Sequence, residues 1–231
     1  MNEHTVKAFD ADIGELRGLI SQMGGLAEEA IGKAMLALQR GDQALAARVR
    51  ADDNAIDAIE AEVERLAVRI IALRAPLAND LREVVAALKI ASVLERIGDY
   101  AKNIAKRVPM IEGAEGGSGG DRIEPISVLP AMGRMASEMV HDVLDAFAAR
   151  DAEAAVRVCE SDTALDDFYD SIFRTLVTFM VENPRTISQV AHLLFVAKNL
   201  ERIGDHAGNV AEMVFFAATG TRMADRPPAK S

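Results

Sequence analysis

The six-residue string Leu-Glu-Arg-Ile-Gly-Asp occurs twice in this chain of 231 residues, at positions 94–99 and 200–205. The match continues past the string, since Ala101, Asn103 and Ala105 correspond to Ala207, Asn209 and Ala211. Two identical strings in equivalent surroundings indicate a tandem duplication, so the chain is expected to fold as two similar halves.

Apolar residues recur at three- and four-residue steps along most of the chain, as at Ile13, Leu16, Ile20 and Met23, which is typical of amphipathic helices. Aromatic residues make up only 4% of the sequence, whereas apolar residues make up 50%, a balance that favours packed helices over sheets. The pattern predicts six long helices, at about 9–39, 42–74, 79–108, 128–150, 151–182 and 185–217.

These helices predict an all-α fold built from two antiparallel three-helix bundles in series, with an elongated overall shape. Residues 1–110 are expected to form the first bundle and residues 126–218 the second. A glycine-rich stretch, 111–125, is expected to be a flexible linker, and residues 219–231 a disordered tail. Within the first helix, Gly24-Gly25 marks a weak point where a bend is expected.

The formal net charge of −10 argues against nucleic acid as a partner, because phosphate binding requires clustered Lys and Arg. The single cysteine, Cys159, excludes an internal disulfide and fits a reducing compartment. The sequence shows no signal peptide and no uncharged stretch long enough to span a bilayer. We therefore expect a soluble, cytoplasmic protein.

Acidic side chains recur in pairs spaced four residues apart, which places both members of a pair on one helix face. On the third and sixth helices the pairs lie roughly opposite the apolar stripe, so they are expected outside the bundle core. The second and fifth helices carry a further pair each. The candidate metal ligands are Glu95, Asp99, Glu201, Asp205, Asp53, Asp57, Asp162 and Asp166.

Carboxylate pairs that face one another repel unless a cation lies between them or their pKa values rise. Oxygen ligands suit hard or borderline cations, which leaves Mg²⁺, Mn²⁺, Ca²⁺ and iron as candidates. The alternative is that these are solvated surface charges. Gly98 and Gly204 occupy the same register in the two strings, and each indicates either close approach of a neighbour or ligand, or helix packing.

Other candidate sites are weaker. His206 follows Asp205, but Tyr100 holds the matching position, so a surface histidine is the simpler interpretation. Cys159 is expected to be a packing residue. The chain lacks the Glu-x-x-His pattern of di-iron bundles, since Gly98 and Gly204 stand three residues after the two glutamates, and it lacks a phosphate-binding loop.

The doubled string resembles the PhoU family of phosphate-responsive regulators. Further matches are Met23-Gly24-Gly25, the segment 69–74 (Arg-Ile-Ile-Ala-Leu-Arg) and Asp80-Leu81-Arg82, so the resemblance covers about residues 4–217. It implies two pseudo-symmetric three-helix bundles and no enzymatic activity. It also implies metal ions, such as iron, zinc, manganese or magnesium, bound by the eight acidic residues above.

The resemblance further implies negative control of phosphate uptake and of the phosphate-starvation response. The expected partners are the ATPase subunit of the phosphate ABC transporter, the sensor histidine kinase of that response and a second copy of the chain in a homodimer. Two alternatives remain at this point. One is a metal-dependent enzyme that uses the same carboxylates, and the other is a purely structural helical scaffold.

Overall fold

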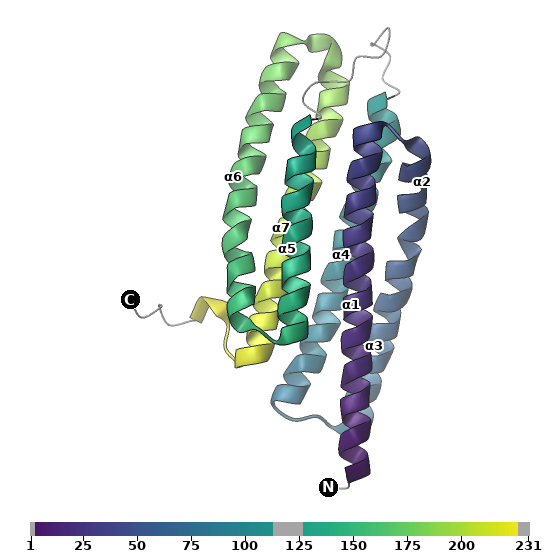
Figure 1. Ribbon diagram of the computed structural model, residues 1–231, viewed down its shortest axis with the longest axis vertical. Helices are drawn as coiled ribbons and strands as arrows, with labels where there is room; N and C mark the ends of the chain where they lie inside the picture. Colours follow the sequence, from purple (N-terminus) through teal and green to yellow (C-terminus); the bar gives the residue numbers. More distant parts are fainter. Residues whose placement is uncertain (1–2, 113–126, 226–231) are drawn as a thin grey trace.

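The computed structural model describes residues 3–112 and 127–225, and it is all-helical over these ranges, which confirms the predicted fold class (Figure 1). The first half contains α1 (Glu3–Arg40), α2 (Gln43–Asp52), α3 (Asn54–Arg74) and α4 (Asn79–Glu112). The second half contains α5 (Leu129–Ala149), α6 (Ala152–Glu182), the short 3₁₀ helix η2 (Pro184–Thr186) and α7 (Ile187–Thr219), followed by η3 (Met223–Asp225).

Equivalent aspartates begin the second helix of each half. The Asp42 carboxylate accepts a hydrogen bond from the backbone N–H of Leu45 at 2.9 Å. The Asp151 carboxylate accepts from the N–H groups of Glu153 and Ala154 at 2.9 and 3.0 Å. Both satisfy backbone donors that the first turn of a helix leaves free, so the duplication includes the caps as well as the apolar stripes.

Several helix boundaries differ from the sequence prediction. The helix expected over 42–74 is interrupted at Asp53, which separates α2 from α3. Helix α4 continues through Pro109 to Glu112, because Ile111 is buried and its carbonyl accepts a hydrogen bond from Gln189 at 3.0 Å. Helix α1 is continuous through Gly24-Gly25, and Gly24 packs closely against Leu144 of the second bundle.

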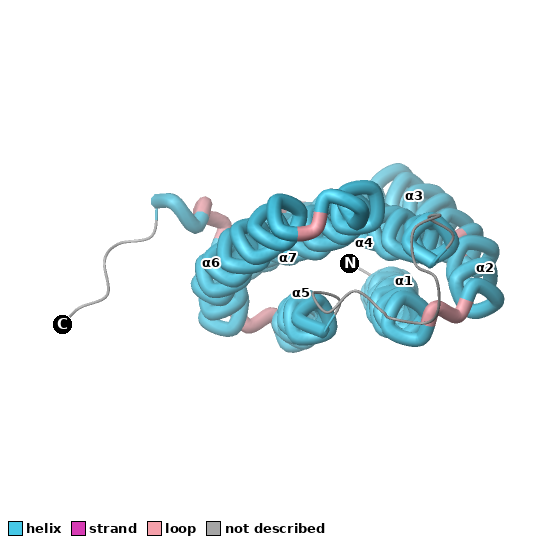
Figure 2. The backbone as a smooth tube through the Cα atoms, turned by 90° about the horizontal axis from the view of Figure 1, so that it is seen from above, coloured by secondary structure: helices cyan, strands magenta, loops and turns pink. Residues whose placement is uncertain are grey.

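The two bundles lie side by side, and the prediction that they stand in series was wrong. Seen from above, α6, α7 and α4 follow one another along one side of the molecule, while α5 and α1 lie along the other (Figure 2). One continuous apolar core runs through both bundles. Helices α4 and α7, the last long helix of each bundle, pack against each other. This contact removes more apolar surface from water than an end-to-end arrangement of the bundles allows.

Reciprocal contacts between the bundles show a pseudo-two-fold relation. A Cβ atom at Gly24 would lie within 2.2 Å of Leu144, and one at Gly133 within 2.8 Å of Met35. These residues are equivalent in the two halves, since Gly133 and Leu144 each follow their counterparts by 109 positions. The same patch of each bundle therefore meets the other, as in a two-fold dimer.

A buried ion pair adds to the inter-bundle contact. Glu83 of α4 is only 4% exposed, and its carboxylate pairs with Arg17 of α1 at 2.5 Å and with Arg150 at the corner between α5 and α6. A buried carboxylate requires such partners, so this group ties the second bundle to the first.

Of the expected linker, 111–125, only residues 111 and 112 are described, and both belong to α4. Residues 113–126 lie outside the described residues. Of the expected tail, Gly220 and η3 follow the end of α7 at Thr219, and residues 226–231 lie outside the described range. Over the described ranges, no helix combines the length and the apolar character that crossing a bilayer requires.

Candidate metal centre

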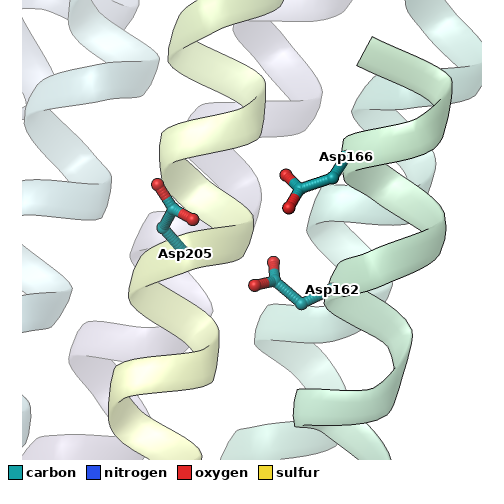
Figure 3. A group of neighbouring side chains, drawn as sticks. All are labelled: Asp162, Asp166 and Asp205. Carbon is teal, nitrogen blue, oxygen red and sulfur yellow. The ribbon is translucent and has the colours of Figure 1, made fainter. Parts of the chain in front are cut away.

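The acidic residues of the second bundle form a compact group, which we call the second acidic cluster: Asp162, Asp166, Glu201 and Asp205. Asp162 and Asp166 project from α6 toward Asp205 on α7 (Figure 3). One carboxylate oxygen of each of these three aspartates lies within 4.8 Å of the others. Among the described residues, this is the one group of potential ligands that converges so closely.

The electrostatics of this cluster are unfavourable without a cation. Burial, and then repulsion from Asp166, Asp205 and Glu201, raise the pKa of Asp162 to about 6. Burial and the Asp205 carboxylate also raise the pKa of Asp166. A carboxylate whose pKa rises for these reasons is held in a place where negative charge is poorly compensated.

Two oxygens of the cluster lack partners. Asp162 Oδ1 and Glu201 Oε2 are buried and accept no hydrogen bond from the described part of the protein. The other oxygen of Glu201, Oε1, accepts from Lys198 Nζ at 2.5 Å, and that ammonium also lies over the Tyr169 ring. Buried acceptors without protein partners are rare, so these two atoms are available to a water molecule or to a cation.

The equivalent residues of the first bundle, which we call the first acidic cluster, are Asp53, Asp57, Glu95 and Asp99. Here a lysine of α4 enters the cluster. Lys102 Nζ lies 2.5 Å from Asp53 Oδ2 and 3.3 Å from Asp99 Oδ1, so it bridges the two helices. Asp53 is only 5% exposed, and the ammonium supplies the charge partner that so deeply buried a carboxylate requires.

The remaining carboxylates of the first acidic cluster are half-buried or exposed. Burial, and then repulsion from Asp99, Glu60 and Asp57, raise the pKa of Glu95. Glu60, which the sequence analysis did not identify, also has a raised pKa because of burial and the nearby Glu64. Negative charge around Glu95 and Glu60 is therefore poorly compensated.

The duplicated glycines allow the helices of each cluster to approach. A Cβ atom at Gly98 would lie 2.7 Å from Ile56 and 3.4 Å from the Asp53 carboxylate. At Gly204 the corresponding distances are 2.3 Å to Leu165 and 3.1 Å to Asp162. Close approach of a neighbour or ligand and helix packing were the alternatives in the sequence analysis. The structure shows helix packing, with an apolar side chain and an aspartate of the neighbouring helix close to each glycine.

The donor sets of the two clusters fit a metal ion to different extents. The second acidic cluster offers converging oxygens with unpartnered atoms, which suits Mg²⁺, Mn²⁺ or iron better than zinc, whose protein sites are rich in nitrogen and sulfur. In the first acidic cluster, Lys102 contacts the oxygens that a cation would take.

Sequence analysis missed Lys102, Lys198 and Glu60. The signal for Lys102 was present, because the repeats read Ala-Lys-Asn at 101–103 and Ala-Gly-Asn at 207–209. A lysine three residues after Asp99 can reach back over the same helix face, whereas its contact with Asp53 on another helix required the fold.

His206 and Cys159, the two weaker candidates of the sequence analysis, have structural roles. His206 is half-buried between the bundles, where its Nε2 atom lies 3.2 Å from the Tyr100 hydroxyl. Burial and the nearby Arg96 lower the pKa of His206. The prediction of a surface histidine was wrong, because this residue and its counterpart Tyr100 meet between α4 and α7. Cys159 is half-buried, and burial raises the pKa of its thiol to about 11.

Fold and site together define a class of protein, an all-α chain of two pseudo-symmetric three-helix bundles. Each bundle has an acidic cluster that includes the two carboxylates of its duplicated string. The profile of the PhoU domain matches residues 20–108 and 129–214. The chain belongs to the PhoU family.

Similar proteins agree over nearly the whole chain. The phosphate-specific transport system accessory protein PhoU homolog of Zymomonas mobilis subsp. mobilis is 55% identical over 98% of this chain and 93% of its own length. That of Caulobacter vibrioides is 44% identical, over 99% and 97%.

Solved structures extend the comparison. The crystal structure of PhoU from Pseudomonas aeruginosa has a TM-score of 0.85 at 38% identity and covers 92% of this chain and all of its own. That of the phosphate transport system regulatory protein PhoU from Streptococcus pneumoniae has a TM-score of 0.83 at 28% identity, with 93% and 99% covered.

Proposed function

We propose that this chain is a metal-binding accessory protein of a phosphate-specific transport system that restrains phosphate uptake and the phosphate-starvation response when phosphate is plentiful. It acts without catalysis, as an adaptor between the ATPase subunit of the phosphate ABC transporter and the sensor histidine kinase, and it forms a homodimer. The observation that carries the proposal is the match, over 98% of the chain, to the phosphate-specific transport system accessory protein PhoU homolog of Zymomonas mobilis subsp. mobilis.

Exposed apolar side chains support a role in docking. Val68 is 63% exposed near the end of α3, and Leu77 is 79% exposed in the turn that follows. In the second bundle, Val181 is 75% exposed at the end of α6, and Ile187 is 48% exposed at the start of α7. These two corners lie at opposite ends of the molecule (Figure 1). We take these exposed apolar side chains as candidate contacts for the two protein partners.

The metal part of the proposal rests on the second acidic cluster. A cation there would neutralise aspartates from α6 and α7 and hold these helices at one spacing, with Asp162, Asp166 and Asp205 as oxygen ligands. Glu201 would add its unpartnered Oε2 atom. The partner-binding surfaces of the bundle would then depend on the metal through the helices that carry them.

The regulatory proposal is tested by deleting the gene from its host and assaying alkaline phosphatase as a phosphate-starvation reporter in excess phosphate. The expected result is a raised reporter signal, and the wild-type gene supplied in trans restores repression. A reporter that stays repressed after deletion would show that the chain has the family's fold with another role.

The metal proposal is tested by equilibrium dialysis of the purified full chain against Mn²⁺. The double variant Asp162→Asn with Asp205→Asn is expected to weaken Mn²⁺ binding by about a hundredfold, because two ligands are lost. Glu138→Gln with Asp142→Asn is the matched control, since it neutralises an exposed acidic pair of the same spacing on α5. Equal Mn²⁺ binding by both double variants would favour a scaffold whose acidic clusters are only solvated.

A further inference from the structure

The residues that follow the two duplicated strings differ at one position that faces an acidic cluster. Lys102 in α4 corresponds to Gly208 in α7, between residues that are the same in both repeats. Lys102 lies one turn from Asp99, and Gly208 lies one turn from Asp205. Both halves therefore retain their carboxylates. At this position, however, only the first acidic cluster has a cationic side chain beside it, that of Lys102.

The Lys102 ammonium occupies the part of the first acidic cluster where the helices meet. It contacts Asp53 of the α2–α3 junction and Asp99 of α4, whose counterparts are Asp162 and Asp205 of the second acidic cluster. The ammonium carries three N–H donors and one positive charge. It therefore compensates the negative charge of carboxylates from two helices, as a bound cation would.

Over the described ranges, no lysine or arginine of the second acidic cluster forms an ion pair with Asp162 or Asp205. Its nearest ammonium, Lys198, pairs with Glu201 and also lies over the Tyr169 ring. Among the described residues, Asp162 Oδ1 has no hydrogen-bond partner. The position of Lys102 is taken by Gly208, where a Cβ atom would lie 3.9 Å from Asp162 Oδ2, an ordinary contact distance.

We infer that Lys102 takes the place of a metal ion in the first acidic cluster, and that metal binding by this chain is confined to the second acidic cluster. This rests on the proposed metal-binding function, which it restricts to one half of the duplication. A metal ion and the Lys102 ammonium compete for the same oxygens of Asp53 and Asp99, and their positive charges repel.

The inference predicts that one residue decides where metal binds. Removing the ammonium by Lys102→Ala, or by Lys102→Gln if the alanine variant folds poorly, is expected to add a class of Mn²⁺ sites to the full chain. Adding an ammonium by Gly208→Lys is expected to weaken the original Mn²⁺ binding by about tenfold or more. Combining Lys102→Ala with Gly208→Lys is expected to move Mn²⁺ binding to the first bundle.

Each variant has a matched control. Lys106→Ala removes an exposed lysine one turn further along α4, and Gly18→Lys adds a lysine on α1, where a Cβ atom meets nothing within 4 Å. Both are expected to leave Mn²⁺ stoichiometry and affinity unchanged. Bound Mn²⁺ is measured by equilibrium dialysis with elemental analysis, and circular dichroism verifies helicity in every variant.

The outcomes separate this inference from the proposal on which it rests. If Asp53→Asn with Asp99→Asn lowers Mn²⁺ binding by the otherwise wild-type chain, metal binds in the first bundle and the inference is wrong, while the metal-binding function stands. If the wild-type chain binds no Mn²⁺, the metal-binding function fails. The part of the inference that concerns Lys102 is then supported if Lys102→Ala creates a site, and the whole inference is overturned if it does not.

Discussion

The two acidic clusters carry the same four carboxylates in the same order, yet their charge is compensated differently. In the first acidic cluster, Lys102 bridges the aspartates of two helices. In the second, burial and mutual repulsion raise the pKa of Asp162 to about 6, and one of its oxygens has no partner. Equivalent carboxylates after a duplication therefore need not have equivalent surroundings, because a neighbouring residue decides how the charge is balanced.

The backbone differs at the same place. Asp53 lies at the break between α2 and α3, and its side chain makes no cap hydrogen bond to α3, because it turns to Lys102. Its counterpart Asp162 lies within α6, which is continuous from Ala152 to Glu182. In the first half the helix break accompanies an internal ion pair, whereas in the second half a regular helix presents Asp162 and Asp166 one turn apart.

The largest expected difference comes from neutralising the equivalent aspartates in metal-free protein near pH 7.5. Asp53→Asn leaves the Lys102 ammonium without its closest partner and should lower the free energy of unfolding by about 2 kcal/mol, less than for a fully buried pair because Lys102 is partly exposed. Asp162→Asn relieves repulsion in the second cluster and should raise it by about 1 kcal/mol.

Urea denaturation in the presence of a chelator measures both changes. Asp142→Asn, an exposed aspartate on α5, is the control and should change the free energy of unfolding by less than about 0.5 kcal/mol. Loss of stability in both cluster variants, to the same extent, would contradict the difference in charge balance between the clusters.

A smaller effect is expected from the two glycines that allow the helices to approach. A Cβ atom at Gly204 would come closer to both Leu165 and Asp162 than one at Gly98 would to Ile56 and Asp53. Overpacking opposes the gain in helix propensity, so Gly204→Ala should destabilise the protein by about 1 kcal/mol more than Gly98→Ala.

Thermal or urea unfolding of the two alanine variants tests this ranking. Gly25→Ala is the control, because its Cβ atom meets nothing within 4 Å, and it should stabilise helix α1 slightly. A greater loss in Gly98→Ala than in Gly204→Ala would mean that the second cluster has the more adaptable packing.

The sequence predicted the fold class and the duplication well, because apolar periodicity and a repeated string can be seen in the sequence itself. It placed Glu95 and Asp99 correctly on one face of a helix. It could not show that Lys102 reaches Asp53, since that contact depends on how α4 lies against the α2–α3 junction. The side-by-side arrangement of the bundles was also beyond it, because contacts such as Gly24 with Leu144 join residues far apart in the chain.

The smallest expected effect is a pH dependence that comes from Asp162 of the second acidic cluster. The folded-state pKa of Asp162 is raised from 3.8 to about 6, so the folded protein binds this proton more tightly than the unfolded chain does. The contribution of Asp162 to stability is therefore greatest below about pH 4 and is lost as the pH rises through about 6. Discounted for the partial exposure of the side chain, the loss should be about 1 kcal/mol.

Because other groups titrate in this range, the quantity to measure is the difference in free energy of unfolding between wild type and Asp162→Asn, from pH 4 to pH 7 without metal. The wild type should lose stability relative to the variant as the pH rises. A constant difference would mean that the second cluster compensates its charge as well as the first does with Lys102, and the contrast between the two halves would then lie in geometry alone.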